Sequence, residues 1–228
     1  MPLLRKAFAE FLGSALLAAT VVGSGITAQR LTRDAGLQLL ENAVITGAAL
    51  VALILALGPV SAAFNPIVTL VERALGAIGT RAAGAFIAAQ VFGCCVGVMV
   101  ANVMYELPVV NVSGHHRSGG GLLLGEVVAT FGLVVVIFGV VRSGRSGSVA
   151  YAVGGYITAA YWFTSSTSFA NPAITVGRML SDTFAGIAPT SVPLFVVMQM
   201  IGGALAIAAV RLLYPDARAV AADVVKQR

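Results

Sequence analysis

Long apolar runs separated by short polar segments make up most of this chain. They predict six membrane-spanning helices at roughly residues 7–28, 38–58, 82–105, 122–141, 148–164 and 190–212. Two uncharged stretches, 42–71 and 146–177, are 30 and 32 residues long. A bilayer core takes about 20 helical residues, so each stretch contains one span and part of another.

Each uncharged stretch carries an Asn-Pro pair near its end, at Asn65-Pro66 and at Asn171-Pro172. Asn is a favoured N-cap and Pro a favoured first helical residue, so each pair predicts the start of a short helix. We expect these half-helices over residues 65–76 and 171–182. Two such half-helices pointing their positive ends into the membrane predict a polar site at mid-membrane. The alternative is a pair of ordinary capped turns at the membrane surface, which the long uncharged flanks disfavour.

Composition supports an integral membrane protein. The chain is 58% hydrophobic and 10% charged, with a mean hydropathy of +0.95 over 228 residues. Too little polar surface is left for a soluble domain. The first apolar segment is long enough to span and is followed by no signal-peptide cleavage site, so we expect it to stay in the membrane.

Basic residues predict the orientation. If the N-terminus is inside, both termini are cytoplasmic, and the protein lies in the inner or plasma membrane as a multi-pass protein. Ten of the 14 basic residues are then cytoplasmic: Arg5, Lys6, Arg73, Arg81, Arg142, Arg145, Arg211, Arg218, Lys226 and Arg228. The net charge of +5 therefore reflects topology, and we expect no nucleic-acid partner.

The chain contains an internal repeat with three landmarks in the same order in each half. They are Glu10 and Glu126, the two Asn-Pro pairs, and the matching motifs Gln90-x-x-Gly93 and Gln199-x-x-Gly202. We expect a first repeat over 1–114 and a second over 115–228, the second with a short cytoplasmic tail. Because each repeat makes three crossings, the two are inverted, and the half-helices dip in from opposite faces.

These motifs, together with Gly58-Pro59-Val60-Ser61 before the first Asn-Pro pair, resemble the aquaporin and aquaglyceroporin family over essentially the whole chain. The resemblance implies an all-α membrane protein with the aquaporin-like fold: six transmembrane helices plus two re-entrant half-helices in two inverted repeats. It also implies one pore per subunit and a homotetramer surrounded by membrane lipids. The pattern is similar to bacterial solute-conducting members, including those associated with arsenic-resistance genes.

The two boxes of this family fall on Asn65, Pro66 and Ile67, and on Asn171, Pro172 and Ala173. Each Asn side-chain oxygen can cap its own helix, which leaves the amide group to donate to the oxygen of a passing neutral molecule. Converging positive helix ends oppose cations and break a proton-conducting water chain. Relatives usually have Ala where this chain has Ile67, so its extra volume either widens or blocks the pore.

Glu10 and Glu126 would cost on the order of 3 kcal/mol if ionised in lipid, so each is expected to face protein or water. The resemblance implies that they brace the loops before the half-helices. A merely interfacial position is the alternative.

The resemblance implies a selectivity constriction at Thr46, Ala159, the backbone of Ser168, and Ile174, which stands where relatives usually have Arg. All four are small or uncharged, which predicts a wider and less polar constriction than in a strict water channel. Arg178, one helical turn beyond Ile174, either returns a positive charge to the outer vestibule or lies solvated at a helix end.

The predicted function is a passive channel for small uncharged molecules, meaning water, glycerol-like polyols or neutral metalloid acids, that excludes ions and protons. No enzyme, metal site or cofactor is expected: His115 and His116 share one loop, and Cys94 and Cys95 are interpreted as packing residues. The first alternative is an ion-coupled secondary transporter of a small solute, which would need ion-coordinating groups at the midplane. The second is a structural tetramer with a closed pore.

Overall fold

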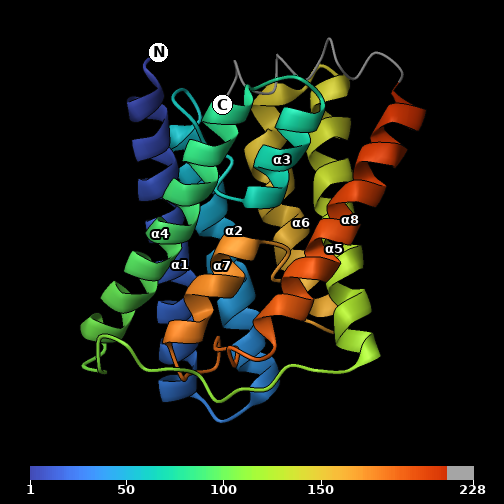
Figure 1. Ribbon diagram of the computed structural model, residues 1–228. Coiled ribbons are helices and arrows are strands. Elements are labelled where there is room, and N and C mark those ends of the chain that lie inside the picture. The colour runs from blue at the N-terminus through green and yellow to red at the C-terminus, as the bar shows by residue number, and fades with distance from the viewer. Residues whose placement is uncertain (215–228) are drawn as a thin grey trace.

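The computed structural model of the protein describes residues 1–214, and within that range it contains helices and no strand (Figure 1). The long helices are α1 (Leu3–Leu31), α2 (Ala35–Leu57), α4 (Thr80–Met104), α5 (Gly120–Arg142), α6 (Val149–Phe163) and α8 (Val192–Leu213). The short helices are α3 (Pro66–Ala74) and α7 (Pro172–Gly177), and the 3₁₀ turns are η1 (Ser146–Ser148) and η2 (Arg178–Leu180). The predicted all-α architecture of six long and two short helices is confirmed.

The long helices pack side by side, and the two short ones lie between them in opposite halves of the bundle (Figure 1). α3 lies in the half that contains the N-terminus, and α7 lies in the other half. Neither short helix crosses the bundle, and their N-terminal ends meet inside it. Mid-bundle backbone of this kind is tolerated only when it is buried in protein or lines a cavity.

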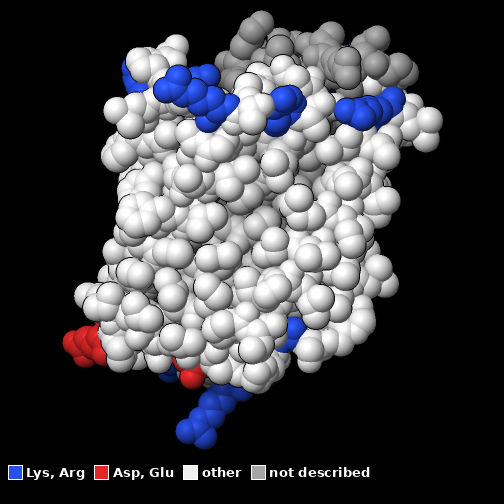
Figure 2. All heavy atoms as spheres, viewed as in Figure 1, with Lys and Arg blue, Asp and Glu red and all other residues white. Residues whose placement is uncertain are grey.

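An uncharged band crosses the middle of the molecule on the face seen in Figure 2. Figure 2 shows Lys and Arg gathered at the end that holds the N-terminus and almost no charge over the middle of this face. Five described helices are long and apolar enough to cross a membrane. The sixth long helix, α6, is shorter than these five: its 15 residues form about 22 Å of helix at 1.5 Å per residue. The turn η1 directly precedes it.

Basic residues gather at one end of the bundle. The described basic residues that were predicted to be cytoplasmic lie on α1, on α5 and α8, and around the α3–α4 connection, at the end of the bundle that holds the N-terminus. Arg218, Lys226 and Arg228 fall outside the described residues.

Both half-helices are shorter than predicted. α3 ends at Ala74 because Gly76 adopts a left-handed φ of +84° and the next residue, Ala77, donates its N–H to the Glu72 carbonyl at 2.8 Å. α7 ends at Gly177, after which the chain tightens into η2 and then becomes extended at Ser181. The predicted limits of 76 and 182 therefore included residues that belong to helix-ending turns.

Close helix contact through glycine sets the spacing of α1 and α4. A Cβ atom built on Gly97 would lie 2.0 Å from the Ala15 carbonyl oxygen, and one built on Gly93 would lie 2.4 Å from the Phe11 carbonyl oxygen. α5 and α8 repeat the arrangement, since a Cβ on Gly202 would lie 2.6 Å from the Val127 carbonyl oxygen. These three glycines let backbones touch, as small residues do between membrane helices.

Replacing Gly97 with Ala should push α1 and α4 apart, because the added methyl group meets rigid backbone rather than a flexible side chain. We expect a loss of about 1–3 kcal/mol of stability, measured as a lower thermal unfolding temperature of the detergent-solubilised protein. The matched control is Gly155→Ala on α6, where a Cβ atom meets nothing within 4 Å. An equal response of both variants would show that backbone contact at Gly97 is unimportant.

Candidate functional site

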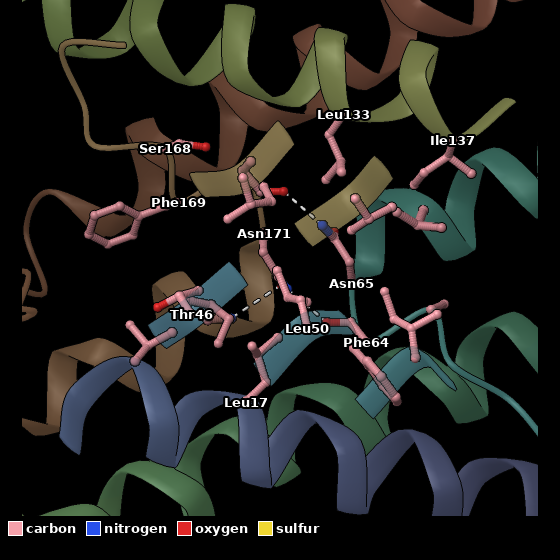
Figure 3. A pocket seen from close by; sticks show the side chains of 18 of the residues that line it. Leu17, Thr46, Leu50, Phe64, Asn65, Leu133, Ile137, Ser168, Phe169 and Asn171 are labelled. Atoms are coloured by element: carbon pink, nitrogen blue, oxygen red, sulfur yellow. Dashed lines mark hydrogen bonds between the residues drawn. The ribbon is translucent and has the colours of Figure 1, made fainter. Parts of the chain in front are cut away.

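The tips of α3 and α7 form the centre of the site, and each is capped by its own Asn (Figure 3). The Asn65 Oδ1 atom accepts a hydrogen bond from the Ile67 N–H at 2.9 Å. The Asn171 Oδ1 atom accepts from the Ala173 N–H at 3.0 Å and from the Ile174 N–H at 3.3 Å. Because Pro66 and Pro172 are the first helical residues, no N–H of theirs is left unsatisfied at the tips.

The two tips are also bonded to each other. Asn65 donates from Nδ2 to the carbonyl oxygen of Ala170 at 2.8 Å, and Asn171 donates from Nδ2 to the carbonyl oxygen of Phe64 at 2.7 Å. The sequence-based expectation left both amide groups free for a permeant. One hydrogen of each amide instead holds the opposite tip, and the second hydrogen of each is still available to donate.

The carbonyls that accept these bonds belong to residues in the left-handed backbone region. Phe64 has a φ of 48° and Ala170 a φ of 47°. Non-glycine residues adopt this region at a cost of about 1–3 kcal/mol each, so other interactions have to hold them there.

Glu10 holds the first of these residues from α1. Its side chain is fully buried. Oε1 accepts from the Ser61 hydroxyl at 2.5 Å and the Ala63 N–H at 2.9 Å. Oε2 accepts from the Phe64 N–H at 2.7 Å and from Gln90 Nε2 at 2.8 Å. This carboxylate therefore fixes the backbone directly before Asn65.

Glu126 does the same from α5. It is fully buried and accepts from the Phe169 N–H and the Ala170 N–H, both at 2.9 Å, and from Gln199 Nε2 at 2.5 Å. Gln199 also donates to the Thr175 hydroxyl at 2.9 Å, just as Gln90 donates to the Thr69 hydroxyl at 2.9 Å. In the sequence the two glutamines stand out only as landmarks of the repeat, although their pairing with the two Glu positions signals a shared site.

A cavity of about 60 Å³ runs past the two tips (Figure 3). At 10–15 Å³ for each water molecule, it holds roughly five. Most of its wall is aliphatic, including Leu17, Leu50, Leu133 and Ile137. The polar side chains in the wall are Thr46, Asn65, Tyr161, Ser168, Asn171 and Arg178.

Three of the four residues predicted for the constriction line this cavity, namely Thr46, Ser168 and Ile174, and the fourth, Ala159, does not. Ala159 is exposed on the outer side of α6. Tyr161 lines the cavity instead, and its hydroxyl lies 3.3 Å from that of Thr46. Ala159 and Tyr161 are two positions apart on α6, and two positions correspond to a rotation of roughly 200° about the helix axis. The assignment by spacing therefore selected a residue on the wrong face of α6.

Arg178 lies in the cavity wall and is only 2% exposed, so the solvated position at a helix end is wrong. Its Nε atom donates to the Ala185 carbonyl, and its guanidinium carbon lies 3.4 Å from the centre of the Phe169 ring. The expectation of an uncharged constriction therefore needs correction. The charge lost at Ile174 is present one helical turn further along the chain.

Ile67 lies away from the cavity. It is 2% exposed, and a Cβ atom built on Gly203 of α8 would lie 2.6 Å from its Cγ2 atom. The extra volume of Ile67 is thus accommodated by the missing side chain of Gly203, and it neither widens nor blocks the cavity.

The remaining sequence candidates lie apart from the site. His115 and His116 are exposed in the segment between α4 and α5, where His116 Nδ1 lies 3.3 Å from the Thr190 hydroxyl. Cys94 and Cys95 are free thiols on α4. Among residues 1–214, no group of three His, Cys, Asp or Glu side chains is arranged to hold a metal ion.

Comparison with known proteins gives consistent matches. Residues 1–161 match the family model described as "Major intrinsic protein". The chain is 46% identical over 217 residues to aquaglyceroporin AqpS of Rhizobium meliloti (strain 1021), covering 95% of this chain and 93% of the relative. It is 28% identical over 210 residues to aquaporin NIP1-1 of Zea mays, covering 89% of this chain and 72% of the relative.

A solved structure shares the fold. The X-ray structure of the aquaglyceroporin from Plasmodium falciparum superposes with a TM-score of 0.74, covering 95% of this chain and 99% of the other. The sequence identity of that pair is 20%, so the likeness is one of fold.

Replacing Glu10 with Gln should loosen the loop before α3, because an amide nitrogen then faces N–H or O–H groups that now meet a carboxylate oxygen. We expect the loss of at least one charged hydrogen bond, roughly 1.5–3 kcal/mol of stability, in thermal unfolding of the purified protein. The control is Glu106→Gln at an exposed position. Unchanged stability of the Glu10 variant would contradict a bracing role.

Replacing Ile67 with Ala should leave a void between α3 and α8 without enlarging the cavity. We expect about 2–5 kcal/mol of destabilisation, seen in thermal unfolding, with glycerol flux into proteoliposomes unchanged. The control is Ile201→Ala, a large-to-small change at a position that is 41% exposed. Faster glycerol flux through the Ile67 variant would mean that this side chain faces the permeant.

Proposed function

This chain belongs to the major intrinsic protein family, and from that premise we propose that it conducts uncharged solutes larger than water. It is an integral membrane protein and a passive channel for small uncharged molecules such as water and glycerol, and it is not an enzyme. The proposal concerns the finer points: which solutes pass, which residues select them, and how the subunits are arranged.

The lining of the cavity is the observation that favours solutes larger than water. The cavity wall combines aliphatic side chains with hydrogen-bonding groups, at Thr46, Tyr161 and the two capping Asn residues. A polyol needs both surfaces, because its carbon chain is apolar while each hydroxyl needs a partner to replace water. Undissociated metalloid acids present hydroxyl groups of the same chemistry and are a second solute class for the same wall.

The same wall disfavours ion-coupled transport. Among the described residues that line the cavity, none is acidic and Arg178 alone is charged. Glu10 and Glu126 are occupied by hydrogen bonds from the loops that they hold. The carboxylates at which transporters commonly couple a solute to Na⁺ or H⁺ are therefore absent from the described wall of this cavity.

Exclusion of ions and protons is proposed to come from the tips. The positive ends of α3 and α7 converge on the cavity, which raises its potential toward cations. The free hydrogens of Asn65 and Asn171 donate to a water or solute oxygen there. A molecule held as acceptor by both cannot continue a donor–acceptor chain, so proton transfer is interrupted.

We propose the two inverted repeats over 1–114 and 115–228. Supporting this division, each half has its own set of Glu, Gln and Thr around one half-helix: Glu10, Gln90 and Thr69 in the first, and Glu126, Gln199 and Thr175 in the second.

We also propose a homotetramer in the cytoplasmic membrane with both termini inside. The Lys and Arg side chains at the end that holds the N-terminus support the orientation (Figure 2). Large apolar side chains exposed on the long helices, such as Phe92, Trp162 and Leu205, would contact lipid or a neighbouring subunit.

Replacing Ile174 with Arg should narrow the outer part of the cavity and add a second guanidinium beside Arg178. We expect glycerol and neutral arsenic or antimony hydroxide flux to fall more than water flux, measured by stopped-flow light scattering or solute uptake in proteoliposomes. Ile174→Val is the matched control, because it keeps the position apolar.

Two results would contradict the proposal. A parent protein that passes water quickly but excludes glycerol and every neutral metalloid hydroxide would be a strict water channel. Equal losses of water and glycerol flux in the Ile174→Arg variant would show that residue 174 does not distinguish glycerol from water.

A further inference from the structure

Two arginines from distant parts of the chain meet one aromatic ring at the outer end of the cavity. The guanidinium carbon of Arg178 lies 3.4 Å from the centre of the Phe169 ring, and that of Arg117 lies 5.0 Å from it. Both distances are within the range of cation–π attraction. Phe169 and Arg178 line the cavity, and Arg117 lies behind them, in contact with the same ring.

Hydrogen bonds to backbone carbonyls hold both arginines. Arg178 donates from Nε to Ala185, and Arg117 donates from Nε to Gly186 at 2.9 Å and from a terminal nitrogen to Phe184 at 3.3 Å. Three successive carbonyls of the α7–α8 connection thus fix the two guanidinium groups. The terminal nitrogens of Arg178 have no hydrogen-bond partner among the described residues, and Arg178 is part of the cavity wall.

The positive charge of this pair is not neutralised locally. Within residues 1–214, neither guanidinium forms an ion pair with an acidic side chain. Glu126 attracts both from a distance, but its oxygens accept the loop N–H groups of Phe169 and Ala170. Two cations therefore face one carboxylate in a region of low dielectric, where charges act more strongly than in water.

We propose that Arg178 discriminates solutes by charge at the outer end of the cavity, with Phe169 as its platform and Arg117 as a second cation that strengthens its field. Neutral solutes pass and can accept hydrogen bonds from the terminal nitrogens of Arg178, while cations of the same shape are repelled. This inference rests on the proposed conduction of neutral solutes and names Arg178 as the residue that repels cations at the outer end of the cavity, before they reach the positive tips of α3 and α7. Ile174, one turn away on the same helix face, contributes apolar surface only.

Urea and guanidinium provide a matched pair of probes, since both are small planar molecules and differ chiefly in charge. In proteoliposomes, the parent protein should pass glycerol and urea and exclude guanidinium. Arg178→Gln should raise guanidinium flux relative to urea flux by about tenfold or more, because the field that repels cations at the outer end of the cavity is lost. Arg178→Lys should keep most of the exclusion, since it retains the charge.

The control for charge is Arg33→Gln, which removes a cation from an exposed position after α1, at the same end of the bundle. It should match the parent with all three solutes. Guanidinium exclusion by Arg178→Gln equal to that of the parent, with glycerol and urea flux intact, would overturn the inference. A parent that conducts neither glycerol nor urea would instead overturn the proposed function.

A second variant tests the same field without removing Arg178. Ile174→Glu places a carboxylate four residues before Arg178, on the same helix face. The carboxylate should neutralise the charge of the Arg178 side chain and so allow the solute guanidinium to pass. Ile174→Gln has the same shape without the charge and should continue to exclude guanidinium. If Arg178→Gln does not yield folded protein, continued exclusion by Ile174→Glu is the result that would overturn the inference.

Discussion

Two reciprocal hydrogen bonds between half-helix tips organise the middle of this protein. The Asn65 amide binds the carbonyl before Asn171, and the Asn171 amide binds the carbonyl before Asn65. Each carbonyl faces the opposite tip because Phe64 and Ala170 adopt left-handed backbone, and each of these residues is held by a buried carboxylate from its own half. Neither half can therefore complete its own tip, and the site forms only when both are folded together.

Local rules made the centre of the site predictable. Asn followed by Pro predicts a capped helix start, whatever the surroundings, and both starts lie where the sequence placed them. A buried acid must find donors, so Glu10 and Glu126 could be expected to face protein. Their donors could be assigned to the following loops only through the family resemblance, since nothing in the spacing says which backbone N–H groups lie nearby.

The outer constriction was less predictable because it depends on helix rotation and on side-chain reach. Counting from the family pattern placed Ala159 in the wall, although Val153, Ile157 and Tyr161 form a buried stripe with four-residue spacing that indicates the correct face of α6. For Arg178, a helix-end position suggested solvent. The Phe169 ring and the carbonyls that bury it come from segments whose placement depends on tertiary structure.

The contact between Ile67 and Gly203 has an evolutionary consequence. The branched side chain of Ile67 on α3 occupies the volume that a residue larger than glycine would need at position 203 of α8. Substitutions at these two positions are therefore coupled: a descendant that gains a methyl group at 203 must first, or simultaneously, shorten residue 67. An evolutionary path between the two combinations should therefore pass through a small residue at both positions, and it should avoid a large residue at both positions.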